Sequence, residues 1–248
     1  MSKILLITGA SRGIGAATAL LAADRGYDVC VNYLASQAAA EGLVGAIRQK
    51  GRRAIAVQAD VSQEAEVVRL FETVDRQLGT LTALVNNTGI LERQTKVENL
   101  TADRLNRIFA TNVTSAFICS REAVRRMATS RGGQGGAIVN VSSMAARLGG
   151  AFEYVDYAAS KGAMDTLTRG LALEVATEGI RVNAVRPGAI YTDIHASGGE
   201  PERVERVAKA IPMQRGGQPQ EVAAAILWLL SEESSYTTGT FLDISGGR

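Results

Sequence analysis

Short apolar runs alternate along the chain with longer segments in which apolar residues recur every three or four positions. The short runs are aliphatic and β-branched without polar alternation, which is typical of strands buried on both faces of a sheet. They predict strands at Lys3–Thr8, Val29–Tyr33, Ala54–Gln58, Ala83–Asn86, Ala137–Val141, Arg181–Val185 and Thr240–Ile244. The longer segments predict helices at Gly15–Arg25, Gln37–Lys50, Glu64–Leu78, Ala102–Met127, Tyr157–Thr177 and Gln220–Leu230.

Regular alternation of strand and helix predicts a single α/β domain over residues 1–248, with a doubly wound parallel sheet of about seven strands and helices on both faces. A length of 248 residues suits one domain with a large core, and no linker divides the chain. Segment 189–211 is the least regular, because Gly198, Gly199 and Pro201 interrupt its helical pattern. We expect it to form a lid, since ligands bind at the carboxyl ends of such strands.

Composition and charge narrow the class of partner. The 27 Lys and Arg residues nearly balance 25 Asp and Glu residues, and the net charge of +2 disfavours nucleic acid or a membrane surface as the partner. No apolar run reaches the roughly 18 residues of a membrane span, and no signal-peptide pattern forms, so we expect a cytoplasmic protein. Cys30 and Cys119 lie in separate apolar stretches and predict buried, reduced thiols. His195 is the only histidine, which disfavours a His-rich zinc site, and we expect no bound metal. The near-zero net charge makes a small molecule the expected partner.

A glycine-rich turn follows the first predicted strand and opens the first predicted helix. Its sequence is Thr-Gly-Ala-Ser-Arg-Gly-Ile-Gly, with glycines at positions 9, 13 and 15. Glycine permits the tight turn at Gly9, leaves space for a pyrophosphate near Gly13 and lets helix pack on strand at Gly15. The helix N-terminus adds a positive potential. The turn therefore predicts a dinucleotide site, with a ligand-free strand-to-helix turn as the alternative.

The end of the second predicted strand bears on the choice of cofactor. It reads Asn32-Tyr33, and no carboxylate occurs from Val29 to Ala40. A site that prefers NAD normally places an acidic residue there to bind the ribose hydroxyls. Arg12 could instead pair with a 2′-phosphate. We therefore favour NADP(H), and NAD(H) remains the alternative because Arg12 could also be a solvated loop residue.

Tyr157 and Lys161 are four positions apart in a helical segment, so their side chains lie on one face. A tyrosine with a pKa of about 10 is a poor acid–base group near neutral pH, but an adjacent ammonium favours its phenolate. Tyr157 would then donate a proton to a carbonyl oxygen as hydride arrives, or accept the proton of an alcohol. Ser142 and Ser143 end a predicted strand and can hydrogen-bond the same oxygen. A surface helix pair is the alternative for the Tyr and Lys.

Together these motifs resemble the short-chain dehydrogenases/reductases, in the single-domain branch that includes 3-oxoacyl-thioester reductases and sugar 1-dehydrogenases. The resemblance covers essentially the whole chain. Besides the glycine turn and the Tyr-x-x-x-Lys pair, it rests on Asp60-Val61, on Asn86-Asn87-Thr88-Gly89, and on Pro187-Gly188 with Thr192. Thr88 replaces the alanine usual in the family.

The resemblance implies a single-domain Rossmann fold and a role for each matched residue. Tyr157 is implied as the acid/base, Lys161 as the residue that lowers its pKa and holds the nicotinamide ribose, and Ser143 as the residue that orients the substrate oxygen. Asn112 is implied in a water-linked proton path to the lysine. The implied cofactor contacts are Gly9, Ser11, Arg12, Gly13, Ile14, Gly15, Asn32, Tyr33, Asp60, Val61, Asn87, Gly89, Tyr157, Lys161, Pro187, Gly188, Ile190 and Thr192.

We therefore expect an NADP(H)-dependent carbonyl reductase or alcohol dehydrogenase that acts on a ketone, an aldehyde or a secondary alcohol. A non-catalytic dinucleotide sensor and an NAD-preferring sugar or alcohol dehydrogenase are the alternatives. The interval from Ser143 to Tyr157 is one position longer than is commonest in the family, so the choice between Ser142 and Ser143 depends on alignment from the strand side. The family resemblance also implies a homotetramer, built through Ala102–Met127, Tyr157–Thr177 and the C-terminal tail.

Overall fold

A seven-stranded sheet forms the centre of the computed structural model, which describes residues 3–248. The strand order is β3-β2-β1-β4-β5-β6-β7, and every neighbouring pair is parallel. The order reverses between β1 and β4, and in doubly wound sheets ligands bind at the carboxyl ends of the strands at such a point. The predicted fold class, a doubly wound parallel sheet, is confirmed.

The bounds of the elements lie close to those predicted from the hydrophobic pattern. The strands are β1 Lys3–Ile7, β2 Tyr27–Tyr33, β3 Ala54–Gln58, β4 Ala83–Asn86, β5 Gly136–Val141, β6 Ile180–Pro187 and β7 Phe241–Ile244. The α-helices are α1 Gly13–Asp24, α2 Gln37–Gln49, α3 Glu64–Gln77, α4 Ala102–Phe109, α5 Ser115–Met127, α6 Ala145–Leu148, α7 Val155–Val175, α8 Ile194–Ser197, α9 Arg203–Ala208 and α10 Pro219–Leu230.

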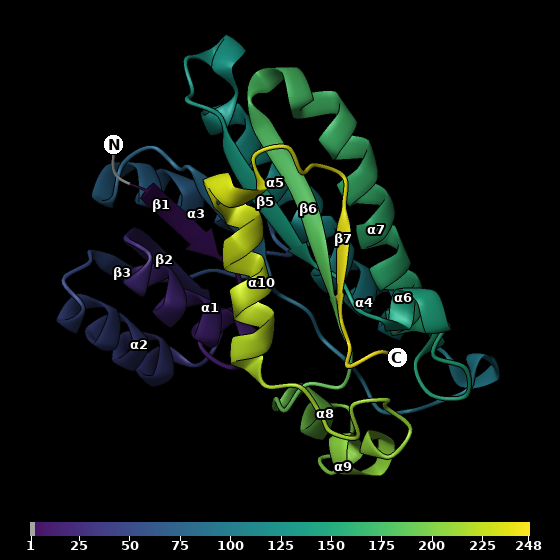
Figure 1. The fold of residues 1–248 in the computed structure, drawn as a ribbon. Coiled ribbons are helices and arrows are strands. Elements are labelled where there is room, and N and C mark those ends of the chain that lie inside the picture. The colour runs from purple at the N-terminus through teal and green to yellow at the C-terminus, as the bar shows by residue number, and fades with distance from the viewer. Residues whose placement is uncertain (1–2) are drawn as a thin grey trace.

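Helices cover both faces of the sheet, with α1, α2 and α10 on one side and α3, α5 and α7 on the other (Figure 1). Successive strand residues point to opposite faces. In β1, Leu5 and Ile7 therefore pack beneath the first helix layer, while Ile4 and Leu6 pack beneath the second. All four are buried, which is why the strands show no polar alternation in the sequence.

The predicted long helix Ala102–Met127 is interrupted, which corrects the expectation of one regular helix. A π-helical turn at Ala110–Thr114 separates α4 from α5. The side chain of Asn112 lies inside this turn and is fully buried. It bonds to the backbone of Ile90 and to Ser160 rather than to its own helix. A wider turn of this kind often marks a functional position.

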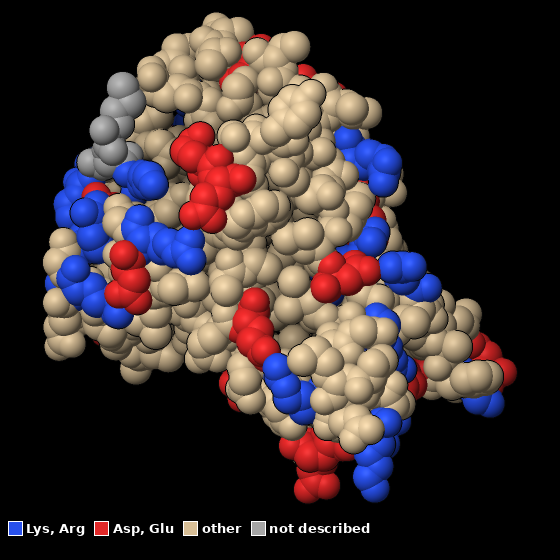
Figure 2. Space-filling view, viewed as in Figure 1, with Lys and Arg blue, Asp and Glu red and all other residues tan. Residues whose placement is uncertain are grey.

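The described residues show two buried thiols and mixed surface charge. Cys30 and Cys119 are both buried and unpaired, as predicted, and burial raises the pKa of each. On the face in Figure 2, basic and acidic side chains are interspersed. Among residues 3–248, no helix combines the length and apolar character needed to cross a bilayer. The same residues hold no group of three or more His, Cys, Asp or Glu side chains arranged around a metal position.

Candidate active site

The sequence motifs meet at the carboxyl edge of the sheet. The glycine turn follows β1, and the Asn87–Gly89 segment follows the neighbouring strand β4. Ser142 and Ser143 follow β5, and Gly188 with the start of the lid follows β6. Because the carboxyl ends of parallel strands share one edge, residues far apart in the chain converge there.

The glycine turn has the shape of a phosphate cradle. Gly9 and Gly13 have φ angles of +60° and +57°, which favour glycine. A Cβ at Gly9 would lie 2.9 Å from Thr88 Oγ1, and one at Gly15 would lie 2.7 Å from Asn87 Nδ2. Helix α1 begins at Gly13 with no acidic residue in its first turn. Its free N–H groups and dipole therefore suit a pyrophosphate, so the residues present fit a dinucleotide.

Two asparagine side chains hold the cradle in place. Asn32 Oδ1 accepts a hydrogen bond from the Gly9 N–H at 3.1 Å, and its Nδ2 donates to the Val57 and Ala59 carbonyls. Asn87 Nδ2 donates to the Thr8 carbonyl at 2.9 Å and the Gly9 carbonyl at 3.0 Å. These bonds connect the ends of β2 and β4 to the turn after β1.

The side chains of Asn32 and Tyr33, two of the expected cofactor contacts, are buried at the end of β2. Asn32 is 1% exposed and Tyr33 is 6% exposed, and the tyrosine packs in the core beside α1 and α2. Asn32 has already committed its amide to backbone partners. Both residues therefore shape the cradle from beneath. The exposed group at this end is Arg12, whose guanidinium lies 3.9 Å from the Asp193 carboxylate.

The remaining predicted cofactor residues flank the cradle. Asp60 follows β3 and accepts hydrogen bonds on Oδ1 from the Ser62 N–H and hydroxyl. A Cβ at Gly13 would lie 3.3 Å from Thr192 Cγ2, so the start of the lid rests against the glycine turn. Ser11 and Ile14 lie in the turn itself, Val61 follows Asp60 and is buried, and Pro187, Gly188 and Ile190 lead from β6 into the lid.

Tyr157 and Lys161 lie in the first two turns of α7, beside the end of β5. Lys161 is 3% exposed, and its Nζ donates a hydrogen bond to the Val141 carbonyl at 2.8 Å. The same nitrogen lies 5.6 Å from the centre of the Tyr157 ring. A Cβ at Gly89 would lie 3.3 Å from it. The amine therefore sits between the tyrosine, the end of β5 and the segment after β4.

The two adjacent serines occupy different surroundings. Ser142 is 3% exposed, and its hydroxyl donates to the Lys161 carbonyl at 3.2 Å. The Ser143 hydroxyl accepts a hydrogen bond from the Ala145 N–H at 3.1 Å and lies close enough to Tyr157 to lower the pKa of its phenol. Ser143 is therefore the serine that neighbours the Tyr157 hydroxyl, while Ser142 braces the backbone of α7.

Burial dominates the proton affinities of the Tyr–Lys pair. It raises the pKa of Tyr157 to about 12, and the Ser143 hydroxyl opposes this change. It lowers the pKa of Lys161 to about 8, and the Asp165 carboxylate opposes that change. The Lys161 ammonium is bonded to the Val141 carbonyl, and the groups that shift the pKa of Tyr157 here are its own burial and the Ser143 hydroxyl. Near neutral pH, Tyr157 carries its proton.

Asn112 fixes the segment that follows β4. Its Oδ1 accepts from the Ile90 N–H at 2.8 Å, and its Nδ2 donates to the Ile90 carbonyl at 3.1 Å and the Ser160 hydroxyl at 3.0 Å. Both N–H donors of its amide are thereby used. Asn112 thus connects the π-turn to α7 and sets the position of Gly89 beside Lys161.

The segment 189–211, which we expect to form a lid, packs against the loop after β4 and the residue that precedes α7. Residues 189–211 form the short helices α8 and α9 with irregular chain between them. A Cβ at Gly198 would lie 2.9 Å from Leu91 Cδ2 and 3.2 Å from Tyr154 Oη. His195 Nε2 lies 3.0 Å from the Ile190 carbonyl, so the only histidine braces the lid. Arg203 and Arg206 of α9 both bind the Glu153 carboxylate next to α7.

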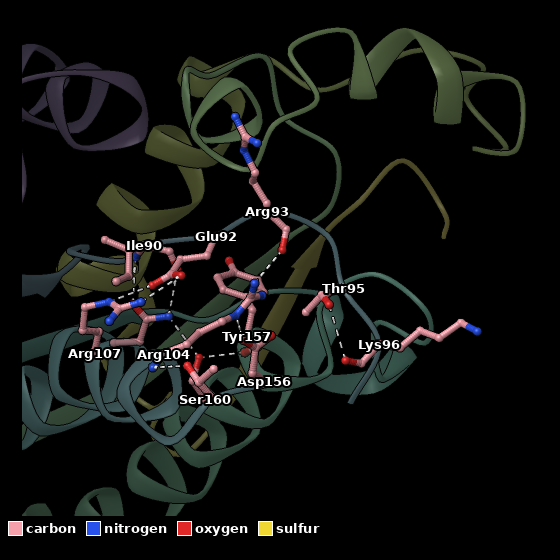
Figure 3. Close-up of polar contacts among 12 residues, drawn as sticks. Ile90, Glu92, Arg93, Thr95, Lys96, Arg104, Arg107, Asp156, Tyr157 and Ser160 are labelled. Carbon is pink, nitrogen blue, oxygen red and sulfur yellow. Dashed lines mark hydrogen bonds and ion pairs between the residues drawn. The ribbon is translucent and has the colours of Figure 1, made fainter. Parts of the chain in front are cut away.

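One charged pair beside Tyr157 has no counterpart among the sequence predictions. Asp156, the neighbour of Tyr157, is 3% exposed, and its Oδ2 lies 2.6 Å from Arg104 Nε of α4 (Figure 3). The two residues are 52 positions apart and belong to no motif. The only signal in the sequence is a carboxylate in the apolar stretch next to Tyr157.

The chain matches known proteins over nearly its whole length. A family model described as "Enoyl-(Acyl carrier protein) reductase" matches residues 9–248. An oxidoreductase of Escherichia coli (strain K12) called YgfF, described as uncharacterized, is 62% identical, and the match covers 99% of both chains. Glucose 1-dehydrogenase 2 of Bacillus subtilis (strain 168) is 36% identical over 99% of this chain and 94% of the relative.

A solved structure agrees with the sequence matches. A short-chain dehydrogenase/reductase of Serratia marcescens, with two phenylalanines replaced by tyrosine, superposes with a TM-score of 0.90 at 32% identity. The match covers 99% of this chain and 97% of that one. With the cradle after β1 and the Tyr-x-x-x-Lys pair on α7, these matches show that the chain belongs to the short-chain dehydrogenase/reductase family of oxidoreductases.

Proposed function

We propose that the protein is an NADP(H)-dependent oxidoreductase that transfers hydride between the nicotinamide and a ketone, an aldehyde or a secondary alcohol. The observation that carries this proposal is the placement of Tyr157, Ser143 and Lys161 around the end of β5, one strand away from the segment that backs the glycine cradle. A non-catalytic sensor would not need a buried lysine amine beside a tyrosine and a serine hydroxyl.

Each of these residues has a defined task. The bound cofactor would supply or accept the hydride. Ser143 orients the substrate oxygen by donating a hydrogen bond, and Tyr157 donates its proton to the same oxygen in the reducing direction. The raised pKa of Tyr157 keeps that proton in place near neutral pH. Lys161 would hold the nicotinamide ribose, and Asn112 keeps the segment at Gly89 beside it.

Preference for NADP(H) rests on the groups at the ends of β1 and β2. Arg12 projects from the cradle with a side chain 62% exposed, free to form a charge-assisted bond with a 2′-phosphate. No carboxylate follows β2 before position 41 to repel that phosphate. The Asp193 carboxylate lies 3.9 Å from the Arg12 guanidinium, but an exposed ion pair at this distance is weak and would compete little with a 2′-phosphate for Arg12.

The comparisons suggest two candidate classes of carbonyl or alcohol substrate. The name of the family model points to acyl-carrier thioesters, and the Bacillus subtilis relative is named for glucose. An acyl carrier, which is acidic, would need an unpaired basic patch near the site. Arg125 is bound by Glu122 at 2.8 Å and Arg126 by Asp75 at 2.7 Å. Both arginines lie at the end of α5, next to the segment that leads into the amino end of β5, so neither provides such a patch at the site, and we favour a free small-molecule carbonyl compound or sugar as the substrate.

We also propose a homotetramer assembled through α4, α5 and α7. Phe109 and Phe117 are 37% and 51% exposed on the first two helices, and Leu173 is 77% exposed on α7. Apolar side chains of this size on a helix face favour burial against another copy. Sedimentation of the purified protein tests this assembly.

The activity itself is tested by following the absorbance of NADPH and NADH in parallel against ketones, aldehydes, sugars with the oxidised cofactors, and a 3-oxoacyl thioester. We expect turnover that prefers NADPH. Binding of both cofactors without turnover of any member of the panel would favour the sensor instead.

A further inference from the structure

Arg104 forms a buried ion pair with the residue that precedes Tyr157. Its Nε lies 2.6 Å from Asp156 Oδ2, and the two side chains are 12% and 1% exposed. The pair joins α4 to the first turn of α7 (Figure 3). Because both charges are withdrawn from water, each depends on the other to offset the cost of its burial.

Asp156 connects this ion pair to the backbone of Tyr157. Its second oxygen, Oδ1, accepts a hydrogen bond from the Tyr157 N–H at 2.9 Å. This N–H lies in the first turn of α7, where no carbonyl of the helix can reach it. The carboxylate therefore binds the backbone of the reactive tyrosine with one oxygen and the guanidinium of α4 with the other.

Arg104 also holds the loop that follows β4. Its Nη1 donates to the Arg93 carbonyl at 2.7 Å. The same loop donates from the Thr95 N–H to the Glu153 carbonyl at 3.0 Å, just before α7 begins. Glu153 in turn binds two arginines of the lid. One guanidinium thus fixes the first turn of α7 relative to the loop that lies beneath the lid.

A buried ion pair adds little net stability compared with apolar residues of the same volume, so stability alone does not account for it. Its geometry does something that apolar packing cannot, because it fixes the direction and height of a particular peptide N–H. We propose that Arg104 is a positioning residue for the reaction, which through Asp156 holds Tyr157 at the height where its hydroxyl meets the substrate oxygen. This inference rests on the proposed role of Tyr157 as acid/base.

The chain provides a matched control on the same helix. Arg107, three positions further along α4, binds the Glu92 carboxylate with Nε at 3.1 Å and Nη2 at 3.2 Å. This pair holds the same loop, but Arg107 is 58% exposed and its pair does not include α7. The Arg107→Met variant therefore shows the effect of a loosened loop on kcat while the Arg104–Asp156 ion pair stays intact.

The experiment compares Arg104→Met, Arg104→Lys, Asp156→Asn, the double variant Arg104→Met/Asp156→Asn, and Arg107→Met. For each we would measure kcat, KM, the dissociation constant of NADPH by fluorescence, and the primary isotope effect with cofactor deuterated at the transferred position. Thermal unfolding establishes that each variant is folded. Arg104→Lys keeps the charge beside Asp156 and serves as the conservative variant if Arg104→Met does not fold.

We expect Arg104→Met to lower kcat on the order of tenfold to a hundredfold, because misplacing a catalytic group slows the chemical step. The isotope effect should be larger than in the parent. The dissociation constant of NADPH should stay within about twofold of the parent value, because cofactor binding is not affected. Arg104→Lys should recover part of the loss. The double variant should lose little more than the worse single variant, because each change removes the same Arg104–Asp156 ion pair. Arg107→Met should retain most of kcat.

The proposal is overturned by a loss of kcat that is no larger than the loss of folded protein, or by an equal loss in Arg107→Met. Additive losses in the double variant also overturn it. Failure of the proposed function has a separate signature: Tyr157→Phe would remain active. An inactive Tyr157→Phe combined with an unaffected Arg104→Met overturns the positioning role alone.

Discussion

The Lys161 amine donates a hydrogen bond to the Val141 carbonyl at 2.8 Å and lies 5.6 Å from the ring of Tyr157. The last residue of β5 thus holds the lysine of α7 within reach of the segment after β4. Keeping a buried amine at this place is costly, since burial lowers its pKa to about 8. The charge is retained at the expense of stability, as is common at reactive sites.

Replacing Lys161 should therefore change how stability depends on pH. The pKa of Lys161 is about 8 in the folded protein against 10.5 as the ordinary value, so the unfolded chain binds more protons between these pH values and stability rises with pH there. Each pKa unit corresponds to about 1.4 kcal/mol, so the penalty below pH 8 is roughly 3 kcal/mol. We expect the free energy of unfolding of Lys161→Met at pH 7 to exceed that of the parent by about 1–3 kcal/mol.

That gain should shrink as pH rises towards 10.5, where the lysine is neutral in both states. Denaturant unfolding of both proteins at several pH values between 7 and 10 checks it. Parallel stability curves for the two proteins across this range would contradict the burial of a charged amine.

Arg12 should decide the choice of cofactor. Replacing it by alanine removes the only basic side chain of the turn that opens α1. We expect kcat/KM with NADPH to fall about tenfold to a hundredfold, in line with the loss of a charge-assisted bond, and kcat/KM with NADH to change little. Steady-state kinetics with both cofactors measure this, and Arg25→Ala at the far end of α1 is the control. Equal losses with both cofactors would place Arg12 at the shared pyrophosphate instead.

Much of this arrangement is encoded in patterns that a single sequence displays. The strands are predictable from the sequence because both their faces are buried, so that Leu5 and Leu6 are equally apolar although they face different helix layers. The glycine turn is predictable because a left-handed φ and a close approach of neighbouring residues leave little choice of residue at Gly9. The order of the motifs along the chain then predicts their meeting, because parallel strands share one carboxyl edge.

Features that depend on contacts between distant segments left no such trace. At the π-turn Asn112 bonds to Ile90 and Ser160, which are distant in the sequence. The local pattern of apolar residues does not predict those partners. The support that the Asn32 amide gives to the glycine turn is shown only by its hydrogen bonds to Gly9 and Ala59. The pairing of Arg104 with Asp156 likewise becomes visible only once α4 and α7 lie side by side.

Gly198 should be needed for the lid to close. Its φ of −75° is open to any residue, so an alanine there meets only a steric obstacle, the Leu91 side chain at 2.9 Å and Tyr154 Oη at 3.2 Å. We expect Gly198→Ala to raise the KM of the carbonyl substrate severalfold and to leave the dissociation constant of NADPH unchanged. Gly42→Ala in α2 is the control, because nothing lies within 4 Å of its added Cβ. An unchanged KM in Gly198→Ala would mean that the lid does not close on the substrate.

The central claim is that Tyr157 transfers the proton while Ser143, rather than Ser142, orients the oxygen that receives it. The most direct measurement is single-turnover oxidation of bound NADPH by a carbonyl substrate in the parent, Tyr157→Phe, Ser143→Ala and Ser142→Ala, with NADPH affinity determined for each. We expect losses of about 10² to 10⁴ in the first two variants at nearly unchanged NADPH affinity, and a much smaller loss in Ser142→Ala. A Tyr157→Phe variant that reduces the substrate at the parent rate would contradict the account.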